Sequence, residues 1–337
     1  MGAVLLSGAT GFVGREILSR FLERGDRHIF ALVRAENDDQ AAARLPAHDR
    51  LTVVAGDIEQ PELGLSDAAR ELLRREVTTV LHCAASVSFD LPLEESRSVN
   101  VEGTRRMLEL ARSCHRLERF SYVSTAYVAG EPGGLFREDE LAVGQRFRNP
   151  YERSKFEAEL ALRSEGRDLP LQILRPSIVV GDSTTGRTSS FNVLYGPLKA
   201  FARGAVPAIP ANRDAPVDIV PVDYVADRVY ELATHGPDGT FHLVAGKNAT
   251  TVGRLLEMSS QELGRRQPTV LSPRLYRRWV HPWLRRKHRG LRRMEVYFPY
   301  FAMRVRFDDR RLGPGPRVEG YFHRLVRYAQ AAGWGRR

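Results

Sequence analysis

The chain has 337 residues, 42% of them hydrophobic and 27% charged, which is ordinary for a soluble globular protein with room for one large domain or a domain and a smaller lobe. Two cysteines, Cys83 and Cys114, exclude a disulfide framework and predict reduced thiols in a cytoplasmic protein. No apolar run reaches 18 residues and no charged segment precedes the first apolar run, so neither a membrane span nor a signal peptide is expected.

The net charge of +10 is distributed unevenly along the chain. From Gly264 onward there are 20 Arg and Lys residues against 4 Asp and Glu residues, a balance of +16, whereas the first 263 residues carry −6. Such a basic segment predicts an anionic neighbour: a nucleic acid, a membrane surface, a phosphorylated carrier or a nucleotide. The alternative is a solvated basic face in an arginine-rich chain.

The N-terminus reads as strand, tight glycine turn and helix. The apolar run of residues 3–6 leads into Ser7-Gly8-Ala9-Thr10-Gly11-Phe12-Val13-Gly14, and an amphipathic stretch follows to Leu22. Gly8 permits the positive φ of a tight turn, Gly11 lets a phosphate approach the backbone, and Gly14 lets the helix pack close to the strand. The free N–H groups of the helix end suit an anion, for which the pyrophosphate of a dinucleotide is the natural ligand.

Strand-like and helix-like runs then alternate, which predicts an α/β fold: a Rossmann-type, doubly wound parallel sheet with a smaller C-terminal substrate-binding lobe. The strand-like runs are short and apolar without clean alternation, as in strands covered on both faces. They lie at residues 28–33, 51–55, 78–83, 120–124 and 171–174, with helical patterns at 15–24, 66–75, 93–113 and 151–164.

The pattern loosens after Gly181. Residues 182–192 read as a loop, and a short strand at 217–224 enters a helix at 222–233 before another strand at 241–244. We therefore expect residues 1–180 to form mainly the nucleotide-binding core, with a strand and helix return near 217–245. Residues 181–265 are expected to supply substrate-binding segments interleaved with the core, and residues 266–337 form a basic, aromatic C-terminal region.

Two strand ends carry candidate cofactor contacts. The second strand ends at Arg34, where a dinucleotide fold for NAD usually has an acidic residue; an Arg suits a 2′-phosphate, and Arg44 is a second candidate cation. The third strand ends at Asp57-Ile58, where a carboxylate can accept from an adenine amino group while the isoleucine packs on the ring. The alternatives are a solvated Arg34 and a turn or capping role for Asp57.

The fourth strand runs into Ala84-Ala85-Ser86, small residues that let backbone lie close to a flat cofactor. Asn100 falls within a helical pattern, and a buried amide there needs partners from the backbone or water.

The pair Tyr151 and Lys155 carries the sharpest chemical signal. Residues i and i+4 share a helix face, which puts a phenol beside an ammonium. A nearby cation favours phenolate, so we expect the pKa of Tyr151 to be lowered into the range of an acid–base catalyst. A hydroxyl from Ser124 or Thr125, at the end of the fifth strand, would complete the grip on a substrate oxygen. Alone, the spacing also fits a surface pair.

Metal-site, nucleophile-elbow and P-loop motifs are absent from the sequence, so no metal is expected. His82, in a predicted strand, reads as a hydrogen-bonded core residue.

Taken together, these residues resemble the extended short-chain dehydrogenase/reductase superfamily over roughly residues 1–250. Within it the chain resembles the thioester reductase and fatty acyl-CoA reductase ("male sterility") branch, through the stretches at residues 54–66, 82–89, 123–128, 149–159 and 175–181. The resemblance implies Thr125 as hydroxyl partner, Tyr151 as proton donor and Lys155 as ribose anchor. It implies an NADPH site that takes in Gly8, Thr10, Gly11, Phe12, Val13, Gly14, Arg34, Arg44, Asp57, Ile58, Ala84, Ala85, Ser86, Asn100, Ser124, Tyr151, Lys155, Pro176, Ser177 and Ile178.

The resemblance implies an NADPH-dependent reductase of acyl thioesters, acting on acyl-CoA or on an acyl carrier protein and yielding an aldehyde and, with a second hydride, an alcohol. An NAD(P)-dependent epimerase/dehydratase or a hydroxysteroid-type dehydrogenase is the alternative enzyme, and an NADP(H)-binding redox sensor is the alternative without catalysis. No nucleic-acid partner is expected. Peripheral membrane contact through the basic C-terminal region stays open, and the sequence does not fix the oligomeric state.

Overall fold

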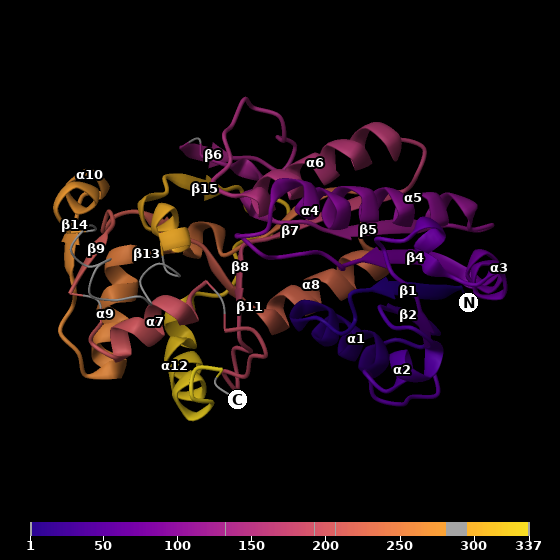
Figure 1. Cartoon of the computed structure of the whole chain (residues 1–337), viewed down its shortest axis with the longest axis horizontal. Coiled ribbons are helices and arrows are strands. Elements are labelled where there is room, and N and C mark those ends of the chain that lie inside the picture. Colours follow the sequence, from indigo (N-terminus) through magenta and orange to yellow (C-terminus); the bar gives the residue numbers. More distant parts are fainter. Residues whose placement is uncertain (1, 132, 192, 206, 281–294, 336–337) are drawn as a thin grey trace. The chain divides into compact units, whose positions relative to one another are not determined.

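We describe the fold from a computed structural model of the chain (Figure 1), which covers residues 2–131, 133–191, 193–205, 207–280 and 295–335. The chain forms two compact units. Unit 1 comprises residues 1–130, 138–176 and 225–243, and unit 2 comprises residues 131–137, 177–224 and 244–337. Part of the predicted basic C-terminal region, residues 281–294 and 336–337, lies outside the described residues.

Unit 1 is built on a seven-stranded sheet in which every neighbouring pair of strands is parallel, in the order β12-β7-β5-β4-β1-β2-β3. This confirms the predicted doubly wound α/β fold. Its strands are β1 (Ala3–Ser7), β2 (Ile29–Val33), β3 (Leu51–Ala55), β4 (Val77–His82), β5 (Arg119–Val123), β7 (Leu171–Pro176) and β12 (Gly239–Leu243). Its helices are α1 (Phe12–Arg24), α2 (Asp38–Ala42), α3 (Asp67–Glu76), α4 (Leu93–Arg97), α5 (Gly103–Ser113), α6 (Pro150–Glu165) and α8 (Val222–His235), with the short turns η1 (Pro61–Gly64), η2 (Ser98–Glu102) and η3 (Ala126–Ala129).

Helices cover both faces of this sheet (Figure 1), and this explains why its strands lack alternation. Every residue of β1, β2 and β4 is buried. In Figure 1, α4, α5 and α6 lie over one face and α1 and α8 over the other. An ion pair of 2.6 Å between Arg20 and Asp227 joins α1 to α8, and Phe21 of α1 makes an edge-to-face contact with Tyr230 of α8.

The predicted helix over residues 93–113 is interrupted. It begins as α4 and ends as α5, and between them η2 has the wider π-helical hydrogen-bonding pattern. Because a π turn displaces the side chains that follow it from the regular helical positions, Asn100 comes to lie where its amide reaches two other segments, described below.

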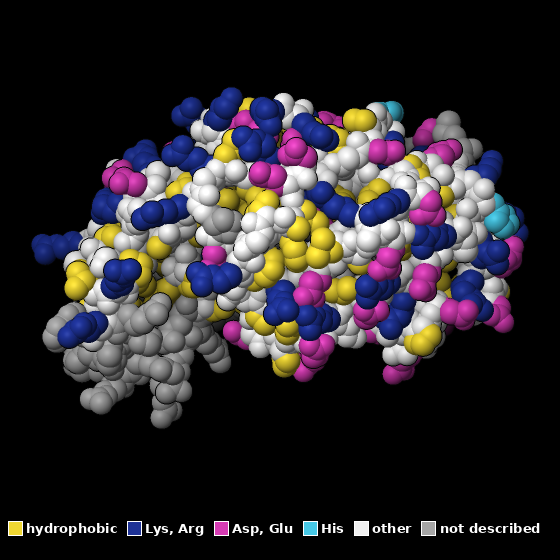
Figure 2. All heavy atoms as spheres, turned by 90° about the horizontal axis from the view of Figure 1, so that it is seen from above, with side chains coloured by type: hydrophobic (Ala, Val, Ile, Leu, Met, Phe, Trp, Pro, Cys, Tyr) yellow, Lys and Arg dark blue, Asp and Glu magenta, His cyan; other side chains and the backbone are white. Residues whose placement is uncertain are grey.

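The face of unit 1 that carries α4, α5 and α6 mixes the two signs of charge (Figure 2). Arg97 of α4 pairs with Glu157 of α6 at 2.7 Å, and Arg105 of α5 pairs with Glu165 at 2.9 Å. The excess of basic residues in the C-terminal part of the sequence therefore has no counterpart on this surface of unit 1.

Unit 2 combines short two-stranded sheets with a helical core. The strands pair as β10 with β13, β11 with β8, β14 with β9 and β15 with β6. They are β6 (Gly134–Phe136), β8 (Ile178–Val180), β9 (Ala208–Pro210), β10 (Pro216–Val217), β11 (Ile219–Pro221), β13 (Thr250–Thr251), β14 (Thr269–Leu271) and β15 (Val305–Phe307). The helices and short turns are α7 (Tyr195–Ala202), η4 (Gly246–Asn248), α9 (Val252–Leu263), α10 (Pro273–Leu275), η5 (Tyr276–Val280), η7 (Glu295–Ala302), η8 (Val318–Gly320) and α12 (Phe322–Ala331).

The core of unit 2 forms where α12 meets α7 and the β8–β11 pair. Phe322, Leu325 and Val326 of α12 are buried together with Tyr195 of α7 and Val180 of β8. None of the described helices combines the length and apolar composition needed to cross a bilayer. Both cysteines of the chain are free thiols in the structure.

We expect Gly14→Ala to lower the free energy of unfolding by about 1–3 kcal/mol, the usual cost of forcing extra atoms into a packed site. A methyl group at this position would lie 2.0 Å from the carbonyl oxygen of Gly8, and backbone cannot move aside as a flexible side chain can. Chemical denaturation measures the change. Gly320→Ala is the control, since a methyl group built there has nothing within 4 Å. Equal losses in the two variants would contradict the steric argument.

Candidate active site

The glycine turn between β1 and α1 is shaped by close backbone contacts. Gly8 has φ +79°, the positive value predicted for it, and a methyl group there would lie 2.6 Å from the backbone nitrogen of Ala84. The N–H of Gly11 donates to the carbonyl of Gly8 at 2.9 Å and closes the turn. The turn follows β1 and Ala84 follows β4, and between these neighbouring strands the order of the sheet reverses. Ligands bind at this point in open α/β sheets.

A crevice of about 230 Å³ opens there, and the predicted cofactor residues line much of its wall. Those present are Gly8, Thr10, Gly11, Arg34, Asp57, Ile58, Ala84 and Ala85, joined by seven residues that were not among the predicted cofactor contacts: Ser7, Leu32, Val33, Gly56, Glu59, Cys83 and Val99. Phe12, Val13 and Gly14 belong to the first turn of α1 rather than to the wall.

Arg34 is exposed at the rim of the crevice. Its guanidinium lies 3.6 Å from the carboxylate of Glu59, and its backbone carbonyl accepts a hydrogen bond of 2.7 Å from Arg44. The predicted second cation therefore contacts Arg34 itself. One carboxylate oxygen of Asp57 accepts from the N–H of Glu59 at 3.0 Å, so Asp57 makes the turn contact that was the alternative interpretation while also lining the crevice.

A hydrogen-bond chain lies beneath the crevice and was missed by the sequence analysis. The hydroxyl of Ser7 accepts from the N–H groups of Cys83 and Ala84 at 3.2 Å and lies 2.7 Å from Nδ1 of His82. Nε2 of His82 lies 3.1 Å from the hydroxyl of Thr104, which donates to the carbonyl of Asn100. His82 is fully buried and burial lowers its pKa to about 3, which confirms that it is a hydrogen-bonded core residue.

Asn100 joins three segments through its side-chain amide. Its Oδ1 accepts from the N–H of Ser86 at 2.8 Å, and its Nδ2 donates to the carbonyl of Ser86 at 3.1 Å and to the hydroxyl of Ser154 at 2.9 Å. Ser154 lies on α6 between Tyr151 and Lys155. Asn100 thus braces the loop after β4 against the helix that carries the predicted catalytic pair.

The helix α6 begins at residues that suit a helix start. Asn149 caps it by accepting from the N–H of Glu152, and Pro150 follows at the first position. Tyr151 is half-buried, its ring lies 5.7 Å from that of Phe89, and its phenol lies near the hydroxyl of Thr125. The structure therefore brings the predicted proton donor and its hydroxyl partner together within unit 1.

Lys155 is 1% exposed. Its Nζ donates to the carbonyl of Val123 at 2.8 Å and lies 4.1 Å from the centre of the Tyr122 ring. Desolvation is the largest influence on its ammonium and lowers the pKa of Lys155 to about 7, although negative charge on Cys83 or Glu159 acts in the opposite direction.

The expected lowering of the pKa of Tyr151 is wrong for this structure. Burial raises the pKa of Tyr151 to about 12, and the neighbouring hydroxyl of Thr125 only partly offsets this. Helical spacing predicted the neighbouring cation but not its desolvation. An ammonium with a pKa of about 7 is only partly charged at neutral pH, so it stabilises a phenolate weakly, and Tyr151 remains a protonated phenol.

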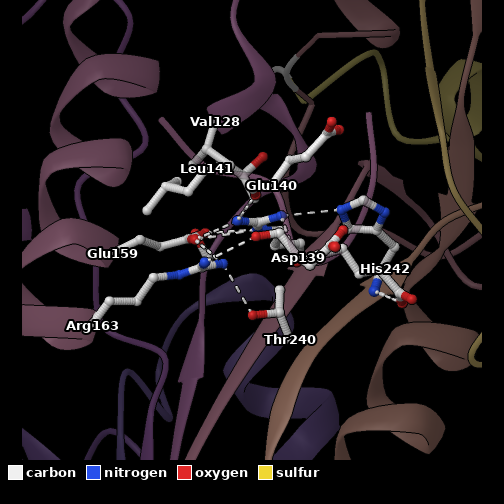
Figure 3. A network of polar contacts seen from close by, with 12 residues as sticks. Val128, Asp139, Glu140, Leu141, Glu159, Arg163, Thr240 and His242 are labelled. Carbon is white, nitrogen blue, oxygen red and sulfur yellow. Dashed lines mark hydrogen bonds and ion pairs between the residues drawn. The ribbon is translucent and has the colours of Figure 1, made fainter. Parts of the chain in front are cut away.

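A buried ion pair one helical turn beyond Lys155 was also missed (Figure 3). Glu159 and Arg175 are both fully buried, and their closest oxygen and nitrogen atoms lie 2.7 Å apart. Figure 3 labels Glu159 within this network, together with Arg163 and His242. Arg175 also donates to the carbonyl of Glu140 at 2.9 Å and lies 3.3 Å from Nε2 of His242. Ser124, predicted to contact the cofactor, instead donates its hydroxyl to Glu159 at 2.5 Å.

The remaining predicted residues are divided between the two units. Pro176 ends β7 in unit 1, and its carbonyl accepts from the hydroxyl of Thr125 at 3.5 Å. Ser177 and Ile178 belong to unit 2. Among the described residues, no group of three or more His, Cys, Asp or Glu side chains is placed to hold a metal ion.

A family model described as male sterility protein, an NAD-binding type, matches residues 6–229, about two thirds of the chain. The chain belongs to this family. Its match takes in the glycine turn, the crevice, Asn100, Thr125 and the Tyr151–Lys155 pair, so the family assignment and the geometry concern the same part of the molecule.

Curated relatives agree with this membership. The chain is 31% identical to the carboxylic acid reductase of Mycobacterium marinum, over 72% of this chain and 24% of that protein. It is 28% identical to fatty acyl-CoA reductase 1 of Gallus gallus, over 74% of this chain and 58% of that protein. It is 30% identical to one component of the linear gramicidin synthase of Brevibacillus parabrevis, over 75% of this chain but 5% of that protein. The chain therefore spans only part of the length of these relatives.

Solved structures show the same fold. The terminal R domain from the myxalamid PKS-NRPS biosynthetic pathway superposes with a TM-score of 0.83 at 26% identity, covering 99% of this chain and 92% of that one. MoeE5, solved in complex with UDP-glucuronic acid and NAD, superposes with a TM-score of 0.69 at 22% identity, covering 98% and 100%. The family and this fold support a nicotinamide cofactor for unit 1.

We expect Asn100→Ala to lower the free energy of unfolding by about 1–3 kcal/mol, because the backbone of Ser86 and the hydroxyl of Ser154 each lose a buried partner. Loosening of the loop after β4 should also weaken dinucleotide binding, measured by the quenching of protein fluorescence. Asn212→Ala is the control, since the Asn212 side chain accepts one local hydrogen bond from Asp214 in an exposed turn. Unchanged binding in the Asn100 variant would show that Asn100 does not brace the crevice.

Proposed function

We propose that the protein is an NADPH-dependent reductase of acyl thioesters, releasing an aldehyde that a second hydride transfer converts to an alcohol. The observation that carries the proposal is that the phenol of Tyr151 on α6 lies near the hydroxyl of Thr125 at the end of β5, with Lys155 one helical turn further along α6. Cys83 links this group to the nucleotide crevice, since it lines the crevice and lies close enough to act electrostatically on both Tyr151 and Lys155. Family membership agrees with this chemistry.

The backbone and the charge of the crevice both suit a dinucleotide. At Gly8 a side chain would collide with the loop after β4, so the turn can stay tight and present its N–H groups to a pyrophosphate. Arg34 at the rim supports NADPH over NADH, because a guanidinium can bind a 2′-phosphate in a bidentate manner. When bound, the reduced nicotinamide supplies a hydride.

Side chains of the site account for the remaining steps of the proposed reduction. Tyr151, a protonated phenol at neutral pH, and Thr125 hydrogen-bond the carbonyl oxygen of the thioester as negative charge develops on it. Hydride addition to the carbonyl carbon and proton transfer from Tyr151 to the oxygen give a hemithioacetal. Its collapse breaks the carbon–sulfur bond, the hydroxyl proton passes to the departing sulfur, and the aldehyde and free thiol separate. Lys155 provides donors for the nicotinamide ribose.

A cavity in unit 2 supports an acyl substrate. It has a volume of about 100 Å³, and no charged residue lines it. Its wall includes Leu198 and Phe201 of α7, Val252 and Leu255 of α9, and Ile178 of β8. The nearby hydroxyl of Ser259 already donates to the carbonyl of Leu255 at 2.6 Å. An apolar cavity of this kind suits hydrocarbon rather than a sugar, which favours an acyl chain over the sugar-nucleotide alternative.

For the group that carries the acyl chain as a thioester, two proposals remain: coenzyme A and a carrier protein. The names of the relatives point both ways, to fatty acyl-CoA reductase 1 and to linear gramicidin synthase. We likewise propose a cytoplasmic location. The redox-sensor alternative and contact of the basic C-terminal region with a membrane also stay proposals, and the assays below do not depend on them.

The test is to mix purified protein with NADPH and a series of acyl-CoA, acyl-carrier and N-acetylcysteamine thioesters, and to follow absorbance at the nicotinamide band while aldehyde and alcohol are identified by mass spectrometry. Thioester-dependent oxidation of NADPH supports the proposal. Absence of oxidation with every thioester and aldehyde would exclude it. Conversion of a sugar nucleotide without net oxidation would support the epimerase alternative.

We expect Tyr151→Phe to lower kcat by about 10²–10⁴-fold, the usual contribution of a positioned general acid, with little change in NADPH affinity. Tyr230→Phe is the control, because Tyr230 lies on α8 with its ring against Phe21. A Tyr151→Phe variant with full activity would remove Tyr151 from the mechanism and revive the redox-sensor alternative.

We expect Arg34→Ala to raise the KM for NADPH about tenfold or more while leaving the KM for NADH nearly unchanged, because a charge-assisted hydrogen bond to the 2′-phosphate contributes about 1.5–3 kcal/mol. Arg167→Ala, which removes an exposed guanidinium beyond α6, is the control. Parallel changes in both KM values would show that Arg34 does not distinguish the two cofactors.

A further inference from the structure

Lys155 is a buried lysine in a chain that uses arginine almost everywhere else. Lysine occurs at positions 155, 199, 247 and 287 among 51 Lys and Arg residues. Unlike arginine, lysine readily loses its proton when buried. A lysine at this buried position in an arginine-rich chain therefore raises the question of what keeps its ammonium charged.

The groups that face Lys155 from β4, β5 and α6 are neutral at pH 7, with one exception. Burial raises the pKa of Cys83 to about 11 and that of Tyr151 to about 12, and it raises the pKa of Tyr122 as well. His82 is a neutral imidazole because burial lowers its pKa. Among the described groups that act on Lys155, Glu159 is the carboxylate, and it forms an ion pair with Arg175.

Glu159 is held in place from three sides. It lies one helical turn after Lys155 on the same face of α6. Its Oε1 accepts from the hydroxyl of Ser124 at 2.5 Å and from Nε of Arg175 at 3.0 Å, while its Oε2 accepts from the terminal nitrogen of Arg175 at 2.7 Å. Arg163 approaches to 3.9 Å (Figure 3). Both carboxylate oxygens are thus engaged and the carboxylate cannot turn away.

These contacts also join the two elements that carry the reacting groups. Lys155 binds the carbonyl of Val123 and Glu159 binds the hydroxyl of Ser124, so α6 grips two consecutive residues at the end of β5. The next residue is Thr125, the partner of Tyr151. The position of Thr125 against Tyr151 therefore depends on a carboxylate that touches neither of them.

We propose that Glu159, held by Arg175, is a positioning residue: it fixes the end of β5 against α6 and supplies the negative charge that favours the ammonium form of Lys155. The inference rests on the proposed function only for its kinetic consequence. Its electrostatic consequence concerns Lys155 alone and needs neither substrate nor cofactor.

The experiment titrates Lys155 directly. Protein labelled with ¹³C at the lysine ε-carbons contains four signals, and Lys155→Arg identifies the signal that belongs to Lys155. In Glu159→Gln, we expect the pKa of Lys155 to fall by about one unit, because an opposite charge nearby is removed. In the control Glu157→Gln it should not move, since Glu157 lies two residues earlier and pairs with Arg97 and Arg153. An unmoved Lys155 signal in folded Glu159→Gln would overturn the proposal.

A second variant guards against misfolding. Glu159→Gln leaves Arg175 buried without a counter-charge, whereas Glu159→Gln/Arg175→Met removes both charges of the pair. A lowered pKa of Lys155 in the double variant, with a normal circular dichroism spectrum, supports the proposal. If neither variant folds, Glu159 acts in folding alone and the proposal is wrong.

The kinetic arm follows kcat against pH with the thioester accepted by the wild-type protein. The ammonium is lost as pH rises through its pKa, so the alkaline limb should shift to lower pH in Glu159→Gln, with kcat at pH 7 reduced about tenfold and the thioester KM within threefold. A pH profile identical to wild type would overturn the proposal. If the wild-type protein reduces no thioester, the proposed function fails while the titration still decides the role of Glu159.

Discussion

The burial of charge beneath α6 is the constraint on which the candidate site depends. Two cations, Lys155 and Arg175, and one anion, Glu159, lie out of contact with water. Removing charges from water is costly unless they are paired and hydrogen-bonded. The structure meets this cost with backbone carbonyls of Val123 and Glu140 and with the hydroxyl of Ser124. These partners come from two separate points in the sequence, the end of β5 and Glu140, so meeting the electrostatic requirement also fixes the geometry of the site.

The same burial has different consequences for Tyr151 and Lys155. Desolvation acts on a phenol and on an ammonium in the same chemical sense, because both favour their neutral forms when buried. Tyr151 is therefore kept as a protonated phenol, while the pKa of Lys155 is lowered to about 7. In the proposed mechanism, acid–base function comes from burial and from Glu159 together, rather than from the attraction of one neighbour for the other.

Much of the fold and part of the site could be predicted from the sequence, because their signals are local. Apolar runs without alternation predicted strands covered on both faces, and three glycines spaced over seven residues predicted the turn. The pair Tyr151 and Lys155 is visible because helical spacing places both on one face. By contrast, the partners of Ser7, Asn100 and Glu159 lie 75, 54 and 16 residues away in the sequence. No local pattern encodes such contacts, and the degree of burial that reversed the expected pKa of Tyr151 depends on all of them.

Arg175 illustrates why a correctly placed motif can still be incompletely understood. The dipeptide Arg175-Pro176 contributed to the family resemblance, and it stands where β7 ends. From the sequence alone, an arginine at the end of a strand suggests an anionic ligand, and this applies to Arg175 as it does to Arg34. In the structure Arg175 is fully buried and its anion is Glu159, whereas Arg34 is exposed at the rim of the crevice. The two arginines differ in desolvation rather than in chemistry. Burial commits Arg175 to an internal partner, whereas exposure leaves Arg34 at the rim of the crevice beside Glu59.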